Sequence, residues 1–518
     1  MSTETKKSVC VIGGGASGVS LLWSLTSQDA ARNAVSLTLL HNEPQLGGHS
    51  RTEYPEFGGV KYPVDIGVQY VCRLLYGNTY RMLDLPEFSD VTLTDGEIRL
   101  SAAFGPDMNW GNFPEYQSGP RFDKLYTQEN QDAAKKFHEA ILLSLPEGKF
   151  SETVGEYLAK ANLPQDFVDY FLMPYLSILN GYGDDKQLQL AAFEDLFPIF
   201  VHLLTPGPLA AFLQPGLGWQ RFTNGSSSWV NAMGKYATDR GATINADCTA
   251  QAVWPDPSGE GVWVSWHTNV SPVTVSQRFD EVVLTTDMNT NCKLLDNAQN
   301  PYFNSANQPI TQQKYIGDDV FQLNPGSCYI HQDKSVLAPW LLDQKEIVQF
   351  TAPYPSVPTG PLPYDMSNAY STYIVQNMVP GLPEPVYVSM FGQSVPPNAP
   401  DEKLWLMPPI QWLHGRFLGS MMVEVKRNLH NIQGLGHIWF AGNNTTQDSE
   451  EGALISAMVI AGKVCPEWNY PFVGFSEADL AATFWYELMK DEFMFPTAAG
   501  GGKLAFFKRL LEGLAHLG

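Results

Sequence analysis

Residues 8–18 read Ser-Val-Cys-Val-Ile-Gly-Gly-Gly-Ala-Ser-Gly, a short apolar strand that runs into the pattern GxGxxG at Gly13, Gly15 and Gly18. In dinucleotide-binding folds the first glycine allows a tight turn, the second lets the backbone approach a pyrophosphate, and the third lets a helix pack closely on the strand. Residues 16–29 follow with an apolar stripe and predict a helix whose partly positive N-terminus faces that pyrophosphate. The stretch predicts a Rossmann-like fold that binds a dinucleotide.

Further segments follow in a defined order. A second apolar strand is expected at residues 35–40, the pair Gly47-Gly48 comes next, and residues 64–70 read Val-Asp-Ile-Gly-Val-Gln-Tyr. Near the other end, residues 436–443 read Gly-His-Ile-Trp-Phe-Ala-Gly-Asn and residues 450–458 read Glu-Glu-Gly-Ala-Leu-Ile-Ser-Ala-Met. Two remote motifs in this order are more specific than either one alone.

This arrangement resembles the FAD-binding half of the amine oxidase, phytoene desaturase and protoporphyrinogen oxidase superfamily. The resemblance covers about residues 8–466 and implies FAD as the cofactor. Segments that begin at residues 170, 279, 329 and 372 look like one branch of that superfamily, the predicted FAD/NAD-binding oxidoreductases associated with fatty-acid modification. The implied fold is α/β, with a Rossmann-like FAD-binding domain (GR2 type) interleaved with an α+β substrate-binding domain.

The resemblance also implies how the chain is divided. Residues 1–80, 225–295 and 425–466 are expected to form the discontinuous FAD-binding domain, and residues 81–224 and 296–424 the substrate domain. Residues 241–253 and 261–266 alternate with period two, as paired strands should, and 279–286 is expected to return as a strand. Residues 130–145 and 164–179 predict helices, and the apolar stretch 196–219 is expected in the core, at a domain interface or along a substrate tunnel. The amphipathic tail 467–518 could pack on the body, pair subunits or rest on a membrane.

The motifs predict the residues that would hold FAD. By resemblance, the glycine pair passes along the pyrophosphate, the Asp-x-Gly segment reaches the flavin, and the amides of Ala453 and Leu454 lie at the pyrimidine edge, where negative charge builds on reduction. The predicted cofactor-binding residues are Gly13, Gly15, Ala16, Ser17, Gly18, His41, Asn42, Glu43, Gly47, Gly48, His49, Ser50, Arg51, Asp65, Gly67, Val68, Gln69, Ala250, Thr286, Gly442, Asn443, Glu451, Gly452, Ala453 and Leu454.

The adenosine side departs from the superfamily pattern at one position. The acidic residue that normally ends the second strand and accepts the ribose hydroxyls falls at His41, with Glu43 two residues later. Either His41 takes over the ribose contact or Glu43 swings into place, and the spacing favours His41.

A second departure follows the glycine pair, where amine oxidases usually have Arg and this chain has His49. Arg51 is then available for the pyrophosphate charge, and His49 could exchange protons beside the flavin or only support the cofactor. Gln69 and Tyr70 follow the Asp-x-Gly segment. His49, Gln69 and Tyr70 are therefore the candidate catalytic residues.

Two further departures lie near the C-terminal motif. Asn443 replaces an acidic residue that holds the ribityl chain, and an amide can still bond a hydroxyl. Monoamine oxidases place a cage tyrosine just before the equivalent Glu-Gly-Ala, whereas this chain has Ser449. The missing aromatic residue argues against ordinary amine oxidation.

Composition limits the remaining classes. The 518 residues include 32 basic and 54 acidic side chains, a net charge of −22 that disfavours nucleic-acid partners and anionic membranes. Six scattered cysteines show no metal-binding spacing, so no metal site is predicted, and they favour a reduced, cytoplasmic location. The N-terminus shows no apolar signal region and four prolines interrupt the longest apolar stretch, so no transmembrane segment is expected.

These observations predict an FAD-dependent oxidoreductase that takes a hydride from carbon of an apolar, unsaturated or fatty-acyl substrate in lipid metabolism. Three alternatives remain: a flavin-dependent fatty-acid double-bond isomerase, an amine oxidase, and a non-catalytic flavin-binding protein. A homodimer formed through the C-terminal tail is a further expectation.

Overall fold

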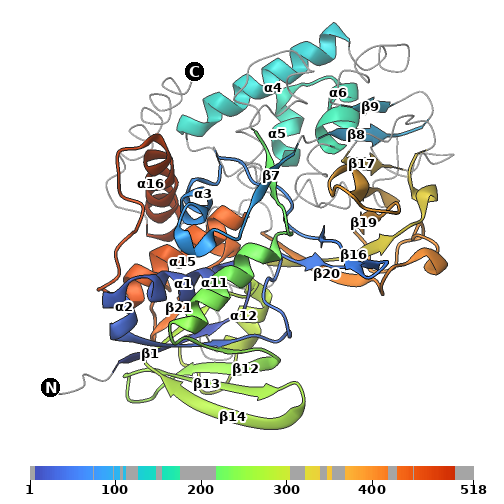
Figure 1. Cartoon of the computed structure of the whole chain (residues 1–518). Coiled ribbons are helices and arrows are strands. Elements are labelled where there is room, and N and C mark those ends of the chain that lie inside the picture. The colour runs from blue at the N-terminus through green and yellow to red at the C-terminus, as the bar shows by residue number, and fades with distance from the viewer. Residues whose placement is uncertain are drawn as a thin grey trace.

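The computed structural model describes residues 6–73, 75–96, 99–105, 109–111, 127–147, 154–174, 218–303, 321–338, 347–352, 368–417, 429–446 and 449–495. Within them the chain forms two bodies, each built around a β-sheet (Figure 1).

The first body contains a five-stranded, all-parallel sheet in the order β11-β2-β1-β15-β21. Its central strand β1 is short, apolar and buried, as strands of a parallel sheet covered on both faces should be. Val9 and Val11 point into one apolar core, and Cys10 and Ile12 into another. The strands are β1 (Lys7–Ile12), β2 (Val35–Leu40), β11 (Thr243–Asn245), β15 (Glu281–Leu284) and β21 (Ile438–Phe440).

Helices cover one face of this sheet and an antiparallel sheet lies on the other (Figure 1). On the helical side, α1 packs against both α15 and α11. The helices of this body are α1 (Ala16–Ser27), α2 (Asp29–Ala34), α3 (Gly77–Leu83), α11 (Ser227–Asp239), α12 (Met288–Leu295) and α15 (Glu450–Val464).

The predicted strand pairing near residue 250 is partly wrong. Residues 241–253 divide at Asp247, whose φ of +54° turns the chain, so that β11 joins the parallel sheet and β12 (Cys248–Pro255) pairs with β13 (Val262–Thr268). A third strand, β14 (Ser271–Phe279), was not predicted, because its polar, exposed residues show no buried face. The strand expected at 279–286 is β15.

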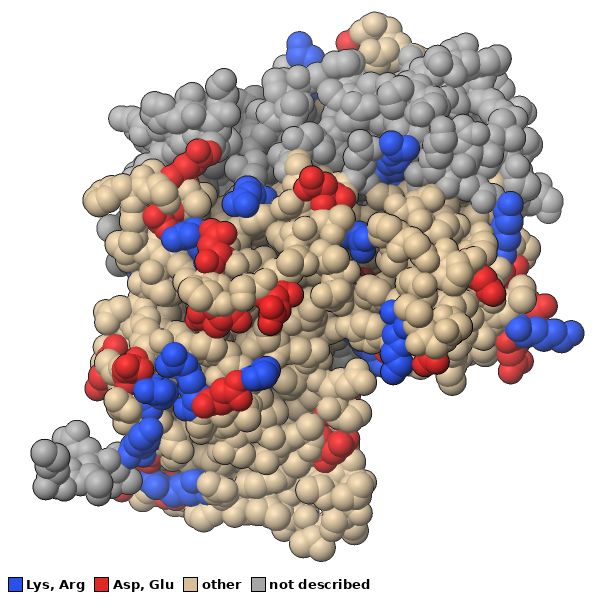
Figure 2. All heavy atoms as spheres, viewed as in Figure 1, with Lys and Arg blue, Asp and Glu red and all other residues tan. Residues whose placement is uncertain are grey.

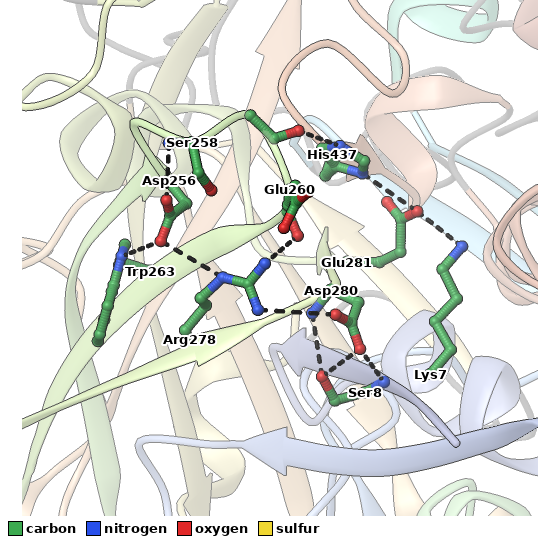
Figure 3. A network of polar contacts seen from close by, with 11 residues as sticks. Lys7, Ser8, Asp256, Ser258, Glu260, Trp263, Arg278, Asp280, Glu281 and His437 are labelled. Carbon is green, nitrogen blue, oxygen red and sulfur yellow. Dashed lines mark hydrogen bonds and ion pairs between the residues drawn. The ribbon is translucent and has the colours of Figure 1, made fainter. Parts of the chain in front are cut away.

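A polar network joins the antiparallel sheet to the edge of the parallel sheet where β1 begins (Figure 3). The Glu281 carboxylate lies 2.7 Å from Lys7 Nζ and accepts a hydrogen bond from Trp439 Nε1 at 2.8 Å. Ser8 Oγ donates to Asp280 at 2.7 Å. These polar contacts lie where β1 begins, whereas the glycine loop follows the end of β1. They have a structural role.

The second body contains a seven-stranded mixed sheet in the order β20-β16-β19-β18-β17-β8-β9. Helices α4 (Gln128–Glu147), α5 (Val154–Ala161) and α6 (Gln165–Phe167) lie beside the β8–β9 end (Figure 1). The predicted helix at 130–145 is α4; the one at 164–179 begins with α6 and a π-type turn, and residues 175–217, including most of the apolar stretch 196–219, lie outside the described residues. The strands are β8 (Leu100–Ala103), β9 (Asn109–Gly111), β16 (Phe321–His331), β17 (Val348–Thr351), β18 (Tyr370–Ile374), β19 (Tyr387–Phe391) and β20 (Ile410–Phe417).

Short strands lie where the two bodies meet. A two-stranded ribbon of β7 and β10 rises between the sheets, and its neighbour β3–β6 carries the Asp-x-Gly segment (Figure 1). These strands and one small hairpin are β3 (Thr52–Glu53), β4 (Glu56–Phe57), β5 (Val60–Lys61), β6 (Val64–Asp65), β7 (Leu93–Asp95) and β10 (Gln220–Phe222).

The described part of the C-terminal tail packs on the first body. Helix α16 (Glu477–Met489) lies against α3, where Asp479 accepts from Arg81 at 2.7 Å, and Trp468 and Trp485 join the same apolar core as Val9. The second amphipathic stretch of the tail, within 496–518, lies outside the described residues.

Several expectations concern the surface and the cysteines. All six cysteines are buried and form no disulfide. In the described segments no helix is long and apolar enough to cross a membrane, and no cluster of metal-ligating side chains is present. On the face in Figure 2, described Lys and Arg side chains are scattered among Asp and Glu side chains and form no continuous basic area.

Candidate functional site

The glycines of the first motif have different structural roles. Gly13 has a φ of +117° and a Cβ there would lie 2.6 Å from Thr285 Oγ1, while a Cβ on Gly18 would overlap the Gly13 carbonyl oxygen. Gly15 differs, because its φ is −74° and a Cβ there would lie 3.8 Å from the nearest described atom, the Gly48 Cα. The fold itself therefore requires glycine at positions 13 and 18 but not at 15.

His41 forms hydrogen bonds that hold this loop in place. Its Nδ1 accepts a hydrogen bond from the Gly14 amide at 3.2 Å, so Nε2 carries the proton and donates to the Gln45 carbonyl at 2.8 Å. The side chain is buried, and its two ring nitrogens hold the glycine loop to the segment before Gly47. The expected ribose contact of His41 remains a prediction, as does that of Glu43, whose exposed carboxylate lies 3.8 Å from Arg51 Nη1.

The second glycine pair runs beside the first motif. The Gly47 amide donates to the Gly14 carbonyl at 2.9 Å, and Gly47 and Gly48 have φ values of +144° and +57°. The His49 carbonyl then accepts from the Val68 amide at 3.1 Å. The structure thus brings three predicted cofactor segments together at the carboxyl edge of the parallel sheet.

Asp65 connects the Asp-x-Gly segment to the ribbon between the bodies. One carboxylate oxygen accepts from Thr52 Oγ1 at 2.6 Å and from the Ser226 amide and hydroxyl at 2.7 and 3.0 Å. Burial raises the pKa of Asp65, and these hydrogen bonds act in the opposite direction. Asp65 therefore fixes the position of the residues that follow it, Gly67 to Tyr70.

Gln69 and Tyr70 contain buried polar atoms without partners. Gln69 is 5% exposed, and its Nε2 donates to the Asp65 carbonyl at 3.3 Å. Among the described residues nothing bonds Gln69 Oε1 or the Tyr70 hydroxyl. Buried polar atoms are almost always bonded, so these two indicate a place where a bound molecule supplies the partner.

The C-terminal motif closes the site. Gly442 follows β21 with a φ of +120°, and its amide donates to Ser456 Oγ at 2.8 Å. Thr286, at the end of β15, accepts through its carbonyl from Asn444 Nδ2 at 3.1 Å. The backbone of Asn443 lies in the same turn, and its side chain is outside the described part.

Helix α15 begins at Glu450, directly after its N-cap. Ser449 is that N-cap and accepts from the Gly452 amide at 2.9 Å, and the Ala453 amide donates to the Ser449 carbonyl at 2.9 Å. The expected contact of Ala453 and Leu454 with the flavin remains a prediction. A serine at position 449 is explained by its capping role.

Two acidic residues at this helix start link the site to its surroundings. Ser50 Oγ donates to Glu450 Oε1, which connects the second glycine segment to α15. The Glu451 carboxylate accepts four hydrogen bonds of 2.7 to 2.9 Å from the amides and side chains of Asn78 and Thr79. Glu451 thus anchors the start of α3, which sequence reasoning missed.

The remaining predicted positions surround these segments. Ala250 lies at a bulge of β12, and the Asn42 carbonyl accepts from Asn269 Nδ2 at 2.7 Å. No sequence motif pointed to a role in the site for Glu450, Thr52, Ser226 or Arg221. Only Ser226 had a local signal, the Asn-Gly-Ser turn that starts α11.

His331, at the end of β16, and Asp333, just after it, have a structural role. His331 is fully buried, lies 2.9 Å from Ser389 Oγ through Nε2 and accepts from the Asp333 amide through Nδ1. Burial lowers the pKa of His331 to about 4, so the ring is neutral.

Comparisons with known proteins agree with this architecture. Residues 11–85 match the model of an NAD(P)-binding Rossmann-like domain, which confirms the predicted dinucleotide-binding domain. No curated protein matches the chain in sequence. Solved structures match over almost the whole fold.

Three of these structures illustrate the likeness. An engineered variant of putrescine oxidase is 11% identical, with a TM-score of 0.57, and the match covers 89% of this chain and 99% of that one. Cyclohexylamine oxidase from Brevibacterium oxydans IH-35A is 12% identical, with a TM-score of 0.56 and the same coverage. The CLA-producing fatty acid isomerase from P. acnes is 11% identical, with a TM-score of 0.54 and again the same coverage.

The chain has the fold of the FAD-dependent amine oxidase superfamily. The predicted α/β fold, with a Rossmann-like domain and a second, interleaved body, is confirmed.

Proposed function

We propose that the protein is an FAD-dependent oxidoreductase that acts on carbon of an apolar, unsaturated or fatty-acyl substrate. The observation that best supports FAD as the cofactor concerns Gly15. Neither its φ nor the neighbouring atoms of the described fold require glycine there. We therefore infer that the missing side chain lets a ligand approach the backbone.

The residues present fit FAD. The loop from Gly13 to Gly18, the N-terminus of α1 and the pair Gly47-Gly48 would hold the pyrophosphate by backbone contacts and the helix dipole. The segment from Val68 to Tyr70 would lie at the flavin end, beside the start of α15. When bound, FAD supplies the two-electron acceptor for a hydride from carbon.

The chain's own groups would orient the substrate and exclude water. The buried Gln69 and the half-buried Tyr70 offer polar atoms at the flavin end, and burial of the hydroxyl raises the pKa of the Tyr70 phenol well above its usual range. Tyr70 would therefore act as a hydrogen-bond donor and not as a phenolate base. Ser449, a capping residue at the cage position, supports the proposal of a substrate other than an amine.

A fatty-acid double-bond isomerase is the second candidate, because the isomerase from P. acnes shares the fold over 89% of this chain. The test is anaerobic: the purified protein is mixed with fatty acids, polyenes and amines, and bleaching of the flavin absorbance is recorded. Bleaching followed by release of an oxidised product supports the oxidoreductase. Product with a shifted double bond and no net redox change supports the isomerase, and a colourless protein that takes up no FAD contradicts both.

Location and assembly are also proposals. The six buried cysteines, which form no disulfide, favour a reducing compartment such as the cytoplasm. The described part of the tail packs on its own chain, and a homodimer formed through the tail remains a proposal.

A further inference from the structure

Within the described residues, Arg221 is a buried cation that has no hydrogen-bond or ion-pair partner. The side chain is 5% exposed, and in the described part of the chain no hydrogen bond or ion pair reaches its guanidinium. Arginine is almost never buried this far unless it is paired. Burial lowers the pKa of Arg221, but a guanidinium stays protonated in proteins, so the charge remains.

The backbone places Arg221 opposite Tyr70. Val71 and Gln220 form an antiparallel bridge in which each amide donates to the other carbonyl at 2.8 Å. The residues that flank such a bridge face each other across the strands, with Cβ atoms about 4.5–5.5 Å apart. Tyr70 and Arg221 are these residues, and the positive charge of Arg221 acts to lower the pKa of the Tyr70 phenol, which burial raises.

On the opposite face of the ribbon, the side chain of Gln220 is already hydrogen-bonded. The Gln220 side chain accepts from the Tyr80 hydroxyl and donates to Asp95, both at 2.7 Å. On the Arg221 side, Gly96 leaves room for the Tyr70 ring, since a Cβ there would lie 3.0 Å from Tyr70 Cε1. Arg221 and the Tyr70 hydroxyl thus offer unused donors on the same side.

Asp65 is the acidic group whose charge acts on Arg221, but the two form no ion pair among the described residues. The Oδ1 atom of Asp65 already accepts from Thr52 and Ser226. A guanidinium fork and a hydroxyl form a donor set that matches a carboxylate, with two parallel N–H bonds and one O–H bond.

We propose that Arg221 and Tyr70 bind a carboxylate group of the substrate, at the junction of the two bodies beside the flavin end of the site. The proposal rests on the proposed function for its location next to FAD. It narrows the substrate class to apolar molecules that carry an anionic head group. A protonated amine would be repelled by Arg221.

Calorimetric titration of the FAD-loaded protein tests this with two pairs of probes, decanoate with methyl decanoate and oleate with methyl oleate. In Arg221→Gln, the Kd for the carboxylates should rise roughly ten- to a hundredfold, the usual scale for a lost charge-assisted bond, while ester binding stays unchanged. Tyr70→Phe should weaken carboxylate binding several-fold, and Arg221→Lys should restore part of it. Arg240→Gln, at a surface ion pair with Asp29, is the matched control.

Each contrary result is distinct. Three results would overturn the carboxylate site. Wild type and Arg221→Gln could bind the carboxylates equally well, or the variant could lose as much affinity for the esters as for the acids. The third is that the wild type binds neither acid. Loss of FAD from Arg221→Gln with unchanged preference for acids would assign Arg221 to the cofactor instead. A wild-type protein that takes up no FAD would contradict the proposed function, and the same titrations of the FAD-free wild type and Arg221→Gln would still decide the role of Arg221.

Discussion

Gly15 and Gly48 face each other backbone to backbone. A Cβ on Gly48 would lie 3.0 Å from the Gly15 Cα, whereas a Cβ on Gly15 has no described atom nearer than 3.8 Å. Side chains are thus excluded at Gly48 by the fold, where φ is also positive, and at Gly15 by the proposed ligand alone.

Gly15→Val should abolish FAD retention and leave the protein folded. The valine Cβ meets no described atom closely, and its φ of −74° is an ordinary one, so only the approach of a pyrophosphate is blocked. Flavin content and thermal unfolding of the apoprotein measure the two effects. Gly18→Val is the control and should lower stability itself, because its Cβ would overlap the Gly13 carbonyl. Wild-type flavin content in folded Gly15→Val would show that the phosphate loop lies elsewhere.

Glu451→Gln should destabilise the fold by about 2–3 kcal/mol, because the amide cannot accept all four hydrogen bonds from Asn78 and Thr79. Urea unfolding of the apoprotein measures this loss. If Glu451 instead contacts FAD directly, the apoprotein will keep its stability while FAD affinity falls.

His49→Ala separates two roles for the residue after the glycine pair. We expect FAD affinity to fall while turnover of the flavin-bound fraction survives, since the His49 backbone lies beside Val68 and next to the glycine pair. A flavin-replete variant whose turnover is reduced roughly a hundredfold, with an altered pH profile, would make His49 an acid–base group. The assay uses the substrate that bleaches the flavin fastest.

His331 should make stability depend on pH. Its pKa falls from 6.5 to about 4 in the folded chain, so its contribution is complete above pH 6.5 and is lost as the pH falls toward 4. Between pH 7 and pH 5, wild type should lose about 2 kcal/mol more than His331→Gln, from this group alone. Parallel urea titrations at the two pH values test it, and identical losses would contradict a buried neutral ring.

Positions in the site could be predicted from the sequence where the structural requirement involves neighbouring residues in the chain. Gly13, Gly18 and Gly47 could be placed because tight turns and close backbone contacts need glycine at set spacings. Prediction failed where the outcome depends on partners far away in the chain. Nothing near residue 221 indicates that Arg221 faces Tyr70, because strand pairing decides that.

Single residues also set boundaries that the apolar pattern leaves open. Ser449 caps the start of α15, and its carbonyl accepts from the Ala453 amide. The turn at Asp247 separates β11 from β12. In each case one polar residue decided between structures that the apolar pattern allowed equally.

The position of β1 in its sheet has a consequence for biosynthesis. This strand is synthesised before the other strands of its sheet, yet one of its two neighbours is β15 (Glu281–Leu284), and β21 (Ile438–Phe440) follows still later. Helices α15 and α16, which pack in the same apolar core as Val9 and Val11, are made after all five strands. A nascent chain that ends before β15 cannot complete this sheet, so its exposed apolar strands need protection until β15, β21 and the two helices have been made.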